Sequence, residues 1–157
     1  MHILKQLARD IFLQTINLID PVRLITGSVS LQDEILKIDN EPISLSYFEH
    51  ILLIGFGKAS LKMAGAVESI LENRISGGIV VTNALLDNVQ PTRADVVVGG
   101  HPYPDEGSLR AATRAMELVS GADSRTLIIY LISGGGSSLF ERPIDDGISL
   151  GDLQRMN

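Results

Sequence analysis

The run from Thr126 to Ile132, which leads directly into Ser133 and three glycines, constrains the fold of this chain most strongly. Its almost wholly apolar, β-branched composition predicts a strand buried on both faces, as in a parallel sheet. The glycines, Gly134 to Gly136, cost backbone entropy but let backbone N–H groups approach a ligand closely. With Ser137 and Ser138 they form a loop suited to an anion, and a tight strand-to-helix turn is the alternative interpretation.

The same order of apolar strand, glycine turn and amphipathic helix recurs earlier in the chain. Strands are predicted at 51–54, 77–82 and 95–98, and helical periodicity runs over 63–71 and 109–119. This alternation predicts an α/β fold: a mostly parallel sheet with helices on both faces, which makes a three-layer sandwich. No linker divides the chain, so we expect one domain over residues 1–157.

The first part of the chain is predicted to have a structural role and to contain no catalytic residues. An amphipathic helix is expected up to Asp20-Pro21, which ends or resets it. Residues 22–34 are expected to be irregular or a second short helix. Alternation over 35–45, with a turn at Asp39-Asn40-Glu41, predicts a small hairpin.

Composition excludes several classes of protein. The formal net charge is −6 over 157 residues, so the domain as a whole is not expected to attract nucleic acid. The chain has no cysteine, which excludes disulfides and thiolate metal sites. Its apolar runs are too short for a membrane span and its N-terminus does not resemble a signal peptide, so a soluble cytoplasmic protein is the expectation.

Three predicted loops leave the carboxyl ends of strands, where open parallel sheets bind ligands. They are Gly55–Ser60, Gly99–Glu106 and Ser133–Ser138, and all are rich in glycine or functional side chains. Their shared edge predicts a site for an anionic ligand.

Lys58 is the leading candidate for chemistry at this edge. Leu52 stands where a Walker A loop needs glycine, and Ser60 stands at the third glycine of a dinucleotide fingerprint, so neither motif is present. Beside the other two loops, an anion-binding role for Lys58 is favoured over a solvated lysine. For His101, ligand contact and a rigid connector both stay open.

The acidic and basic residues near the loops are expected mainly to have structural roles or to lie at the surface. Asp105 is expected to cap the helix that follows it. Asp145 and Asp146 suggest a turn more than a Mg²⁺ site. Arg142 is the arginine nearest in sequence to the glycine loop, and it is expected at the surface with Arg110 and Arg114.

Four motifs in register resemble one enzyme family: Ile54–Ser60, Gly78–Thr82, Gly100–Ala112 and Ile132–Ser138. With Gly147–Leu150 after them, they resemble the N-terminal part of the glycerate 2-kinases that carry a C-terminal MOFRL domain. Some relatives in this family are labelled hydroxypyruvate reductases. The likeness covers nearly the whole chain.

The resemblance implies a Rossmann-like domain of an ATP- and Mg²⁺-dependent enzyme that phosphorylates the 2-hydroxyl of D-glycerate. It implies that Lys58 is catalytic and binds substrate with Ser60 and His101. It also implies a nucleotide loop made of Ser133, Gly134, Gly135, Gly136, Ser137 and Ser138. Metal ligands and the general base are not assigned, and a homo-oligomer is left open.

The C-terminal end departs from the family pattern. The segment from Ser149 to Asp152 has the pattern of a capping box at the start of a helix. The chain stops at Asn157, after only a few residues of that helix. We therefore expect a truncated chain that lacks the C-terminal domain, and whether it is active alone stays open. Two alternatives remain: an NAD(P)H-dependent hydroxypyruvate reductase and a non-catalytic anion-binding domain.

Overall fold

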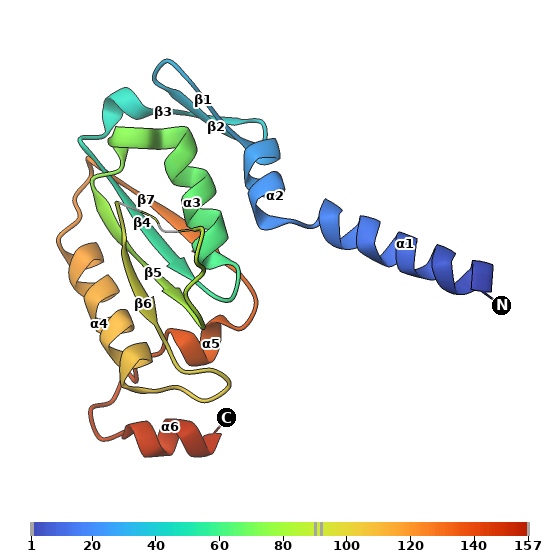
Figure 1. Cartoon of the computed structure of the whole chain (residues 1–157). Coiled ribbons are helices and arrows are strands. Elements are labelled where there is room, and N and C mark those ends of the chain that lie inside the picture. Colours follow the sequence, from blue (N-terminus) through green and yellow to red (C-terminus); the bar gives the residue numbers. More distant parts are fainter. Residues whose placement is uncertain (1, 90, 92, 157) are drawn as a thin grey trace.

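A parallel sheet forms the centre of the computed structural model, which describes residues 2–89, 91 and 93–156. Its four strands are β4 (His50–Phe56), β5 (Gly77–Thr82), β6 (Asp95–Val98) and β7 (Thr126–Ile132), in the spatial order β6-β5-β4-β7 (Figure 1). All three pairings are parallel. The predicted strands are therefore confirmed, and their carboxyl ends share one edge.

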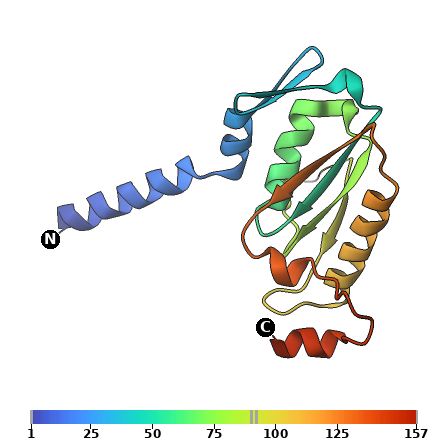
Figure 2. The ribbon, with the colours of Figure 1, turned by 180° about the vertical axis from the view of Figure 1, so that it is seen from behind.

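Helices cover both faces of this sheet, as the sequence predicts (Figures 1 and 2). One face packs on α3 (Ser60–Leu71), and the opposite face packs on α4 (Glu106–Ser120). Adjacent residues of β4 divide between the faces: Leu53 lies in the core on the α3 side and Ile54 in the core on the α4 side. The apolar strands thus bury both faces, which confirms the three-layer α/β architecture.

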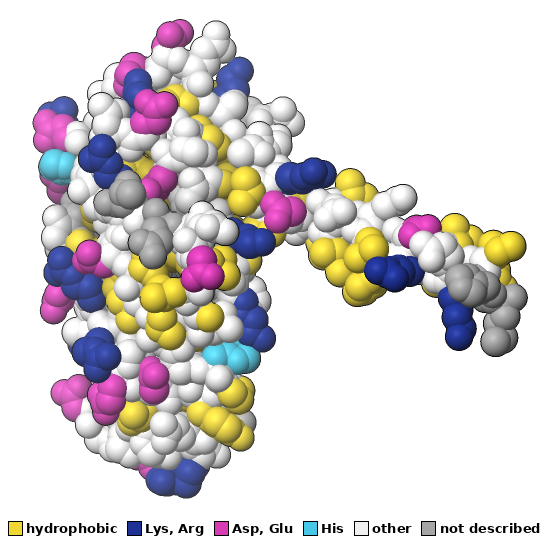
Figure 3. Space-filling view, viewed as in Figure 1, with side chains coloured by type: hydrophobic (Ala, Val, Ile, Leu, Met, Phe, Trp, Pro, Cys, Tyr) yellow, Lys and Arg dark blue, Asp and Glu magenta, His cyan; other side chains and the backbone are white. Residues whose placement is uncertain are grey.

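The N-terminal segment contains two helices of different character. α2 (Pro21–Ser28) begins with Asp20 as its N-cap, packs against α3 and extends the layer on that face. α1 (His2–Leu18) projects away from the body, and its described side chains are exposed (Figures 1 and 3). None of the helices in the described residues is long and apolar enough to span a bilayer.

A small antiparallel sheet caps one end of the molecule. It consists of β1 (Val29–Gln32), β2 (Ile35–Ile38) and β3 (Glu41–Ser44), in that order. The predicted hairpin is β2–β3. β1 is an additional strand in the segment 22–34, which is predicted as irregular or as a second short helix, and α2 is that short helix. Leu36 of β2 is fully buried in the core on the α3 side, which fixes the small sheet to the body.

Short elements complete the fold. Two 3₁₀ turns lie at Leu45–Tyr47 and Glu72–Arg74, and the single helical turn α5 (Gly136–Leu139) follows the glycine loop. α6 (Leu150–Met156) lies beyond the carboxyl ends of the strands (Figure 1). The predicted capping box is confirmed, since Ser149 and Asp152 exchange side-chain to backbone hydrogen bonds of 3.2 and 2.8 Å.

Candidate functional site

The lysine turn and the glycine loop are joined directly at the carboxyl edge of the sheet. The N–H of Lys58 donates to the carbonyl of Gly134 at 3.0 Å, and the N–H of Ala59 donates to the Ser133 hydroxyl at 3.0 Å. The N–H of Ser133 donates in turn to the carbonyl of Phe56 at 3.1 Å. Two loops far apart in sequence therefore form one hydrogen-bonded unit.

Two glycines in this unit have positive φ angles and close neighbours. Gly57 has φ +113°, and a Cβ there would overlap Ser133. Gly135 has φ +81°, and a Cβ there would lie 3.0 Å from Lys58 Cε and 3.4 Å from His101 Nε2. Only glycine adopts such angles without strain. The lysine, the histidine and the glycine loop thus meet at Gly135, as their shared sheet edge predicts.

The loop that carries His101 is held at its base by the start of α4. The Ser108 hydroxyl, which is fully buried, accepts from the N–H of Gly100 at 3.0 Å and of Asp105 at 3.2 Å. Asp105 caps α4 by accepting from the N–H of Ser108 at 2.9 Å, so its predicted capping role is confirmed. The His101–Pro102 peptide bond is cis.

The charge of Asp105 suits this capping position. Partial burial acts to raise the pKa of the Asp105 carboxyl, but hydrogen bonds from Ser108 and Gly100 outweigh it and hold the pKa below its usual value. A carboxylate at a helix N-terminus also interacts favourably with the helix dipole. The lowered pKa keeps the Asp105 carboxyl ionised at neutral pH, and the carboxylate caps α4 at the base of the loop that carries His101.

A second support of this loop comes from α6. Gln154 Nε2 donates to the carbonyl of Pro104 at 2.8 Å, and Pro104 is fully buried. Leu153 of α6 is also buried. Sequence reasoning did not find Gln154, because its partner lies 50 residues earlier in the chain and no local pattern marks the pair.

The predicted site residues differ in how far they are open to solvent, and Ser133 and Gly136 are half-buried. Lys58, His101, Gly134, Gly135 and Ser137 are exposed. Ser60 is fully buried, and its hydroxyl lies 2.8 Å from the carbonyl of Gly57 and 2.7 Å from that of Val81. Ser138 is also buried. These placements give Ser60 and Ser138 internal positions beneath the loops rather than positions open to a ligand.

An aromatic pair supports the glycine loop from below. The rings of Phe56 and Phe140 stack with centroids 4.7 Å apart and an interplanar angle of 7°. A Cβ at Gly136 would lie 2.8 Å from the Phe56 ring, so the third glycine is needed for close packing. The two phenylalanines are far apart in the chain, and the sequence pattern gives no sign that they pair.

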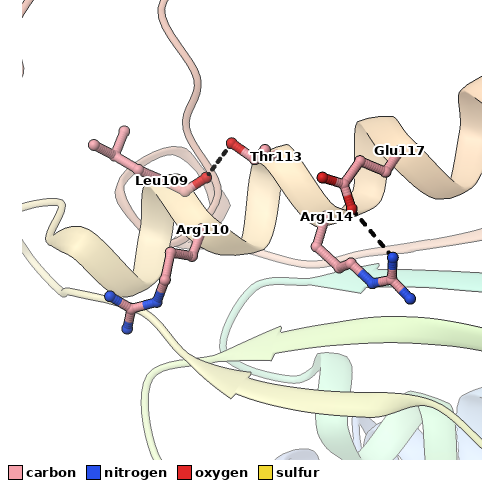
Figure 4. Close-up of a pocket in the computed structure, with 5 residues that line it drawn as sticks. All are labelled: Leu109, Arg110, Thr113, Arg114 and Glu117. Atoms are coloured by element: carbon pink, nitrogen blue, oxygen red, sulfur yellow. Dashed lines mark hydrogen bonds and ion pairs between the residues drawn. The ribbon is translucent and has the colours of Figure 1, made fainter.

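Other candidate groups lie apart from this site. Asp145 accepts from the N–H of Gly147 at 2.8 Å, which forms the expected turn. Among the described residues, no three His, Asp or Glu side chains gather to hold a metal ion. A shallow pocket of about 390 Å³ lies on α4, where Arg114 pairs with Glu117 and Arg110 extends separately (Figure 4). Its residues are on the outer side of the helix, so Arg110 and Arg114 are surface residues as predicted.

Comparison with known proteins identifies the family of this chain. The family described as Domain of unknown function (DUF4147) matches residues 7–157. The chain is 31% identical over 153 residues to D-glycerate 2-kinase of Thermotoga maritima, covering 98% of this chain and 33% of that protein. It is 34% identical over 141 residues to glycerate 2-kinase of Pyrococcus horikoshii, covering 90% and 31%.

Solved structures agree with these sequence relationships. A crystal structure of a Pyrococcus horikoshii protein superposes with a TM-score of 0.79 at 33% identity, over 92% of this chain and 33% of that one. A crystal structure of glycerate kinase from Thermotoga maritima gives a TM-score of 0.72 at 29% identity, over 99% and 34%. The chain thus spans about a third of the length of these relatives. It belongs to the DUF4147 family and matches the N-terminal portion of the glycerate 2-kinases within it.

Proposed function

We propose that this chain supplies part of the active site of a glycerate 2-kinase, which transfers a phosphoryl group from ATP to the 2-hydroxyl of D-glycerate. The observation that carries the proposal is the meeting of Lys58, His101 and Gly135 at the carboxyl edge of the sheet. The names of the Thermotoga and Pyrococcus relatives support the same reaction.

Lys58 is the residue that would stabilise negative charge in the proposed active site. Its side chain passes beside Gly135, where the absence of a Cβ leaves room for it, and its ammonium group could balance negative charge on glycerate or on the transferring phosphoryl group. The hydrogen bond from its backbone N–H to the carbonyl of Gly134 fixes the base of the side chain beside the glycine loop. His101, whose Nε2 lies near the same position of Gly135, would hydrogen-bond the substrate.

The glycine loop would receive the phosphates of ATP. Gly134 and Gly135 are exposed and carry no side chain, and they lead into the first turn of α5, whose N–H groups have no partner within the helix. Ser137 adds an exposed hydroxyl. Ser133 and Ser138 would shape the loop rather than touch the nucleotide.

The family resemblance implies a Mg²⁺ ion, which kinases hold with one or two carboxylates together with substrate phosphates. Among the described residues no cluster of three potential ligands occurs, and no single carboxylate of this chain is assigned to the ion. We therefore assign no step to a metal here. The proposal rests on the anion-binding groups of this chain.

The test compares two lysines on the same part of the chain. This chain would be joined to the remaining two thirds of the Thermotoga maritima relative, and ATP-dependent consumption of D-glycerate would be measured. Lys58→Met is expected to lower kcat by roughly 10²–10³, as removal of one charge-stabilising group does elsewhere. Lys62→Met is the matched control, since Lys62 is 3.6 Å from Asp20 and away from Gly135. Full activity of Lys58→Met would remove Lys58 from the proposal.

A hydroxypyruvate reductase is the second candidate. A protein of Agrobacterium vitis named as a putative enzyme of this kind is 40% identical over 92 residues, covering 59% of this chain. Ser60 at the third fingerprint position disfavours nicotinamide binding. Oxidation of NADH with hydroxypyruvate by the same fusion, without ATP-dependent use of glycerate, would favour the reductase.

A further inference from the structure

A fourth loop leaves the carboxyl edge of the sheet, and the proposed function does not yet use it. β5 ends at Thr82, and the chain continues through Asn83. In the order β6-β5-β4-β7, β5 lies between the strand that leads to His101 and the strand that leads to Lys58 (Figure 1). The first residue after β5 therefore enters the edge between the two side chains that are proposed to act on the substrate.

Backbone hydrogen bonds attach both neighbouring loops to the end of β5. The N–H of Gly57, at the start of the lysine turn, donates to the carbonyl of Val81 at 3.2 Å. The N–H of Gly99, at the start of the histidine loop, donates to the carbonyl of Thr82 at 3.0 Å. Asn83 directly follows these two acceptors, so its backbone is held between the two loops.

The alternation along β5 assigns Asn83 to the side of the sheet on which the site residues gather. Val81 packs in the core on the α4 side, and Phe56 and Phe140, which support the glycine loop, pack against the same core. Residues two apart along a strand share a face, so Asn83 continues the face of Val81 at the strand end. The loop that carries His101 leads into α4 on that side.

The side chain of Asn83 is exposed, and the fold does not use it. Asparagine in a turn commonly hydrogen-bonds the backbone two residues further on. Here the buried Thr82 makes the local bond instead, because its hydroxyl donates to the carbonyl of Ala84 at 3.2 Å. In the part of the chain that the structure describes, the Asn83 amide has no hydrogen-bond partner.

We propose that Asn83 binds the small substrate, a 2-hydroxy carboxylate, through its side-chain amide. This inference rests on the proposed function and adds a substrate-binding residue to it. The amide offers two N–H donors and an acceptor oxygen. A 2-hydroxy acid presents carboxylate oxygens, which only accept, beside a hydroxyl, which also donates. One asparagine can therefore pair with both groups, whereas a lysine can only donate.

Strand order separates this amide from the proposed phosphate loop. The glycine loop follows β7 and Asn83 follows β5, while β4, which leads to Lys58, lies between these two strands. Lys58 thus comes from the strand between the loop proposed for the phosphates of ATP and the amide proposed for the acceptor. Phosphoryl transfer requires a group that neutralises charge at this place.

The experiment uses the fusion to the remaining two thirds of the Thermotoga maritima relative. Binding of D-glycerate is measured by calorimetry without ATP, and the KM values for D-glycerate and for ATP are measured separately. Asn83→Asp keeps the shape of the side chain but replaces the donor by a negative charge. The dissociation constant and the KM for D-glycerate are expected to rise about tenfold or more. The KM for ATP and kcat at saturating D-glycerate should stay within about twofold, because only ground-state binding of one substrate is lost.

Two further variants make the result specific. Asn83→Lys keeps a donor for the carboxylate, so it should raise the dissociation constant less than Asn83→Asp, although it changes the shape more. A merely structural role predicts the reverse order. Asn88→Asp is the matched control at an exposed position of the same loop, beside Val89, which packs on the α3 side. It should leave both KM values unchanged, and circular dichroism of each variant checks folding.

Two results would overturn the inference while leaving the proposed reaction intact. The first is unchanged affinity for D-glycerate in Asn83→Asp. The second is a rise in the KM for ATP alone, since Asn83 would then contact the nucleotide. Asn83-dependent binding of D-glycerate without ATP-dependent consumption would support the inference and refute the kinase reaction. Absence of D-glycerate binding by the unsubstituted fusion would overturn both.

Discussion

Gly135 is the residue at which the candidate site is assembled. Its φ of +81° turns the backbone so that Lys58 and His101 approach from two different loops. A side chain there would press on both, whereas a Cβ at its neighbour Gly134 would meet only open space, and the φ of Gly134 is not positive. The two glycines are adjacent in sequence, but only Gly135 is at a position where the backbone angle and the close neighbours require glycine.

Replacement of these glycines by alanine should separate the two cases. Gly135→Ala is expected to cost about 1–2 kcal/mol of unfolding free energy, because a left-handed angle is strained for alanine. Gly134→Ala should be neutral or slightly stabilising, since it restricts only the unfolded chain. Urea denaturation of both variants checks this, and equal losses would contradict the assignment of strain to Gly135.

The charge on Asp105 contributes to stability over a defined pH range. Its pKa is lowered in the folded state, so its contribution is complete above the unfolded value of about 3.9 and is lost as pH falls through the folded pKa. Asp105→Ala is expected to cost about 1 kcal/mol at pH 7.

The difference between Asp105→Ala and the unsubstituted chain should shrink below about pH 4, as the carboxyl becomes protonated. Thermal unfolding at about pH 7 and about pH 3 measures it. A difference that stays constant with pH would show that the cap acts without its charge.

At the scale of elements, α6 supports the loop that carries His101. Gln154→Ala removes the hydrogen bond to the buried carbonyl of Pro104 and is expected to cost about 1 kcal/mol or more, since that carbonyl loses its partner. The amides of His101, Tyr103 and Asp105 should exchange faster. Arg155→Ala is the control, because Arg155 is exposed and pairs with Asp152 of the same helix. Unchanged exchange in Gln154→Ala would contradict the supporting role.

α1 illustrates a helix whose periodicity predicts the element but not its packing. Its apolar stripe is correctly read as helical, yet side chains such as Leu4, Ile11 and Phe12 are 69%, 57% and 62% exposed. A stripe of this kind marks which side of a helix seeks apolar contact. It carries no information on where in the molecule that contact lies.

For the whole molecule, the central and the edge strands of the sheet should respond differently to truncation. Leu53→Ala in β4 is expected to cost about 2–5 kcal/mol, since Leu53 is fully buried and leaves a cavity. Ile132→Ala in β7 should cost less than about 1 kcal/mol in the isolated chain, because Ile132 is 61% exposed. Urea denaturation of the two variants checks the contrast, and comparable losses would mean that Ile132 is already packed in solution.

The sequence by itself determined the layered α/β fold, because strands buried on both faces must be apolar and helices between them must be amphipathic. It also determined which three loops share an edge, since parallel strands align their carboxyl ends. The caps at Asp105 and Ser149 followed from local chemistry alone.

Only the tertiary structure decided which predicted residues of those loops are open to solvent. Ser60 and Ser138 have the right chemistry and lie in the right loops, but close packing takes them inside, while Lys58 and His101 remain at the surface. The supports from Gln154 and the Phe56–Phe140 stack depend on residues far apart in the chain. Such contacts leave no periodic trace in a sequence, because they arise only when the layers are brought together.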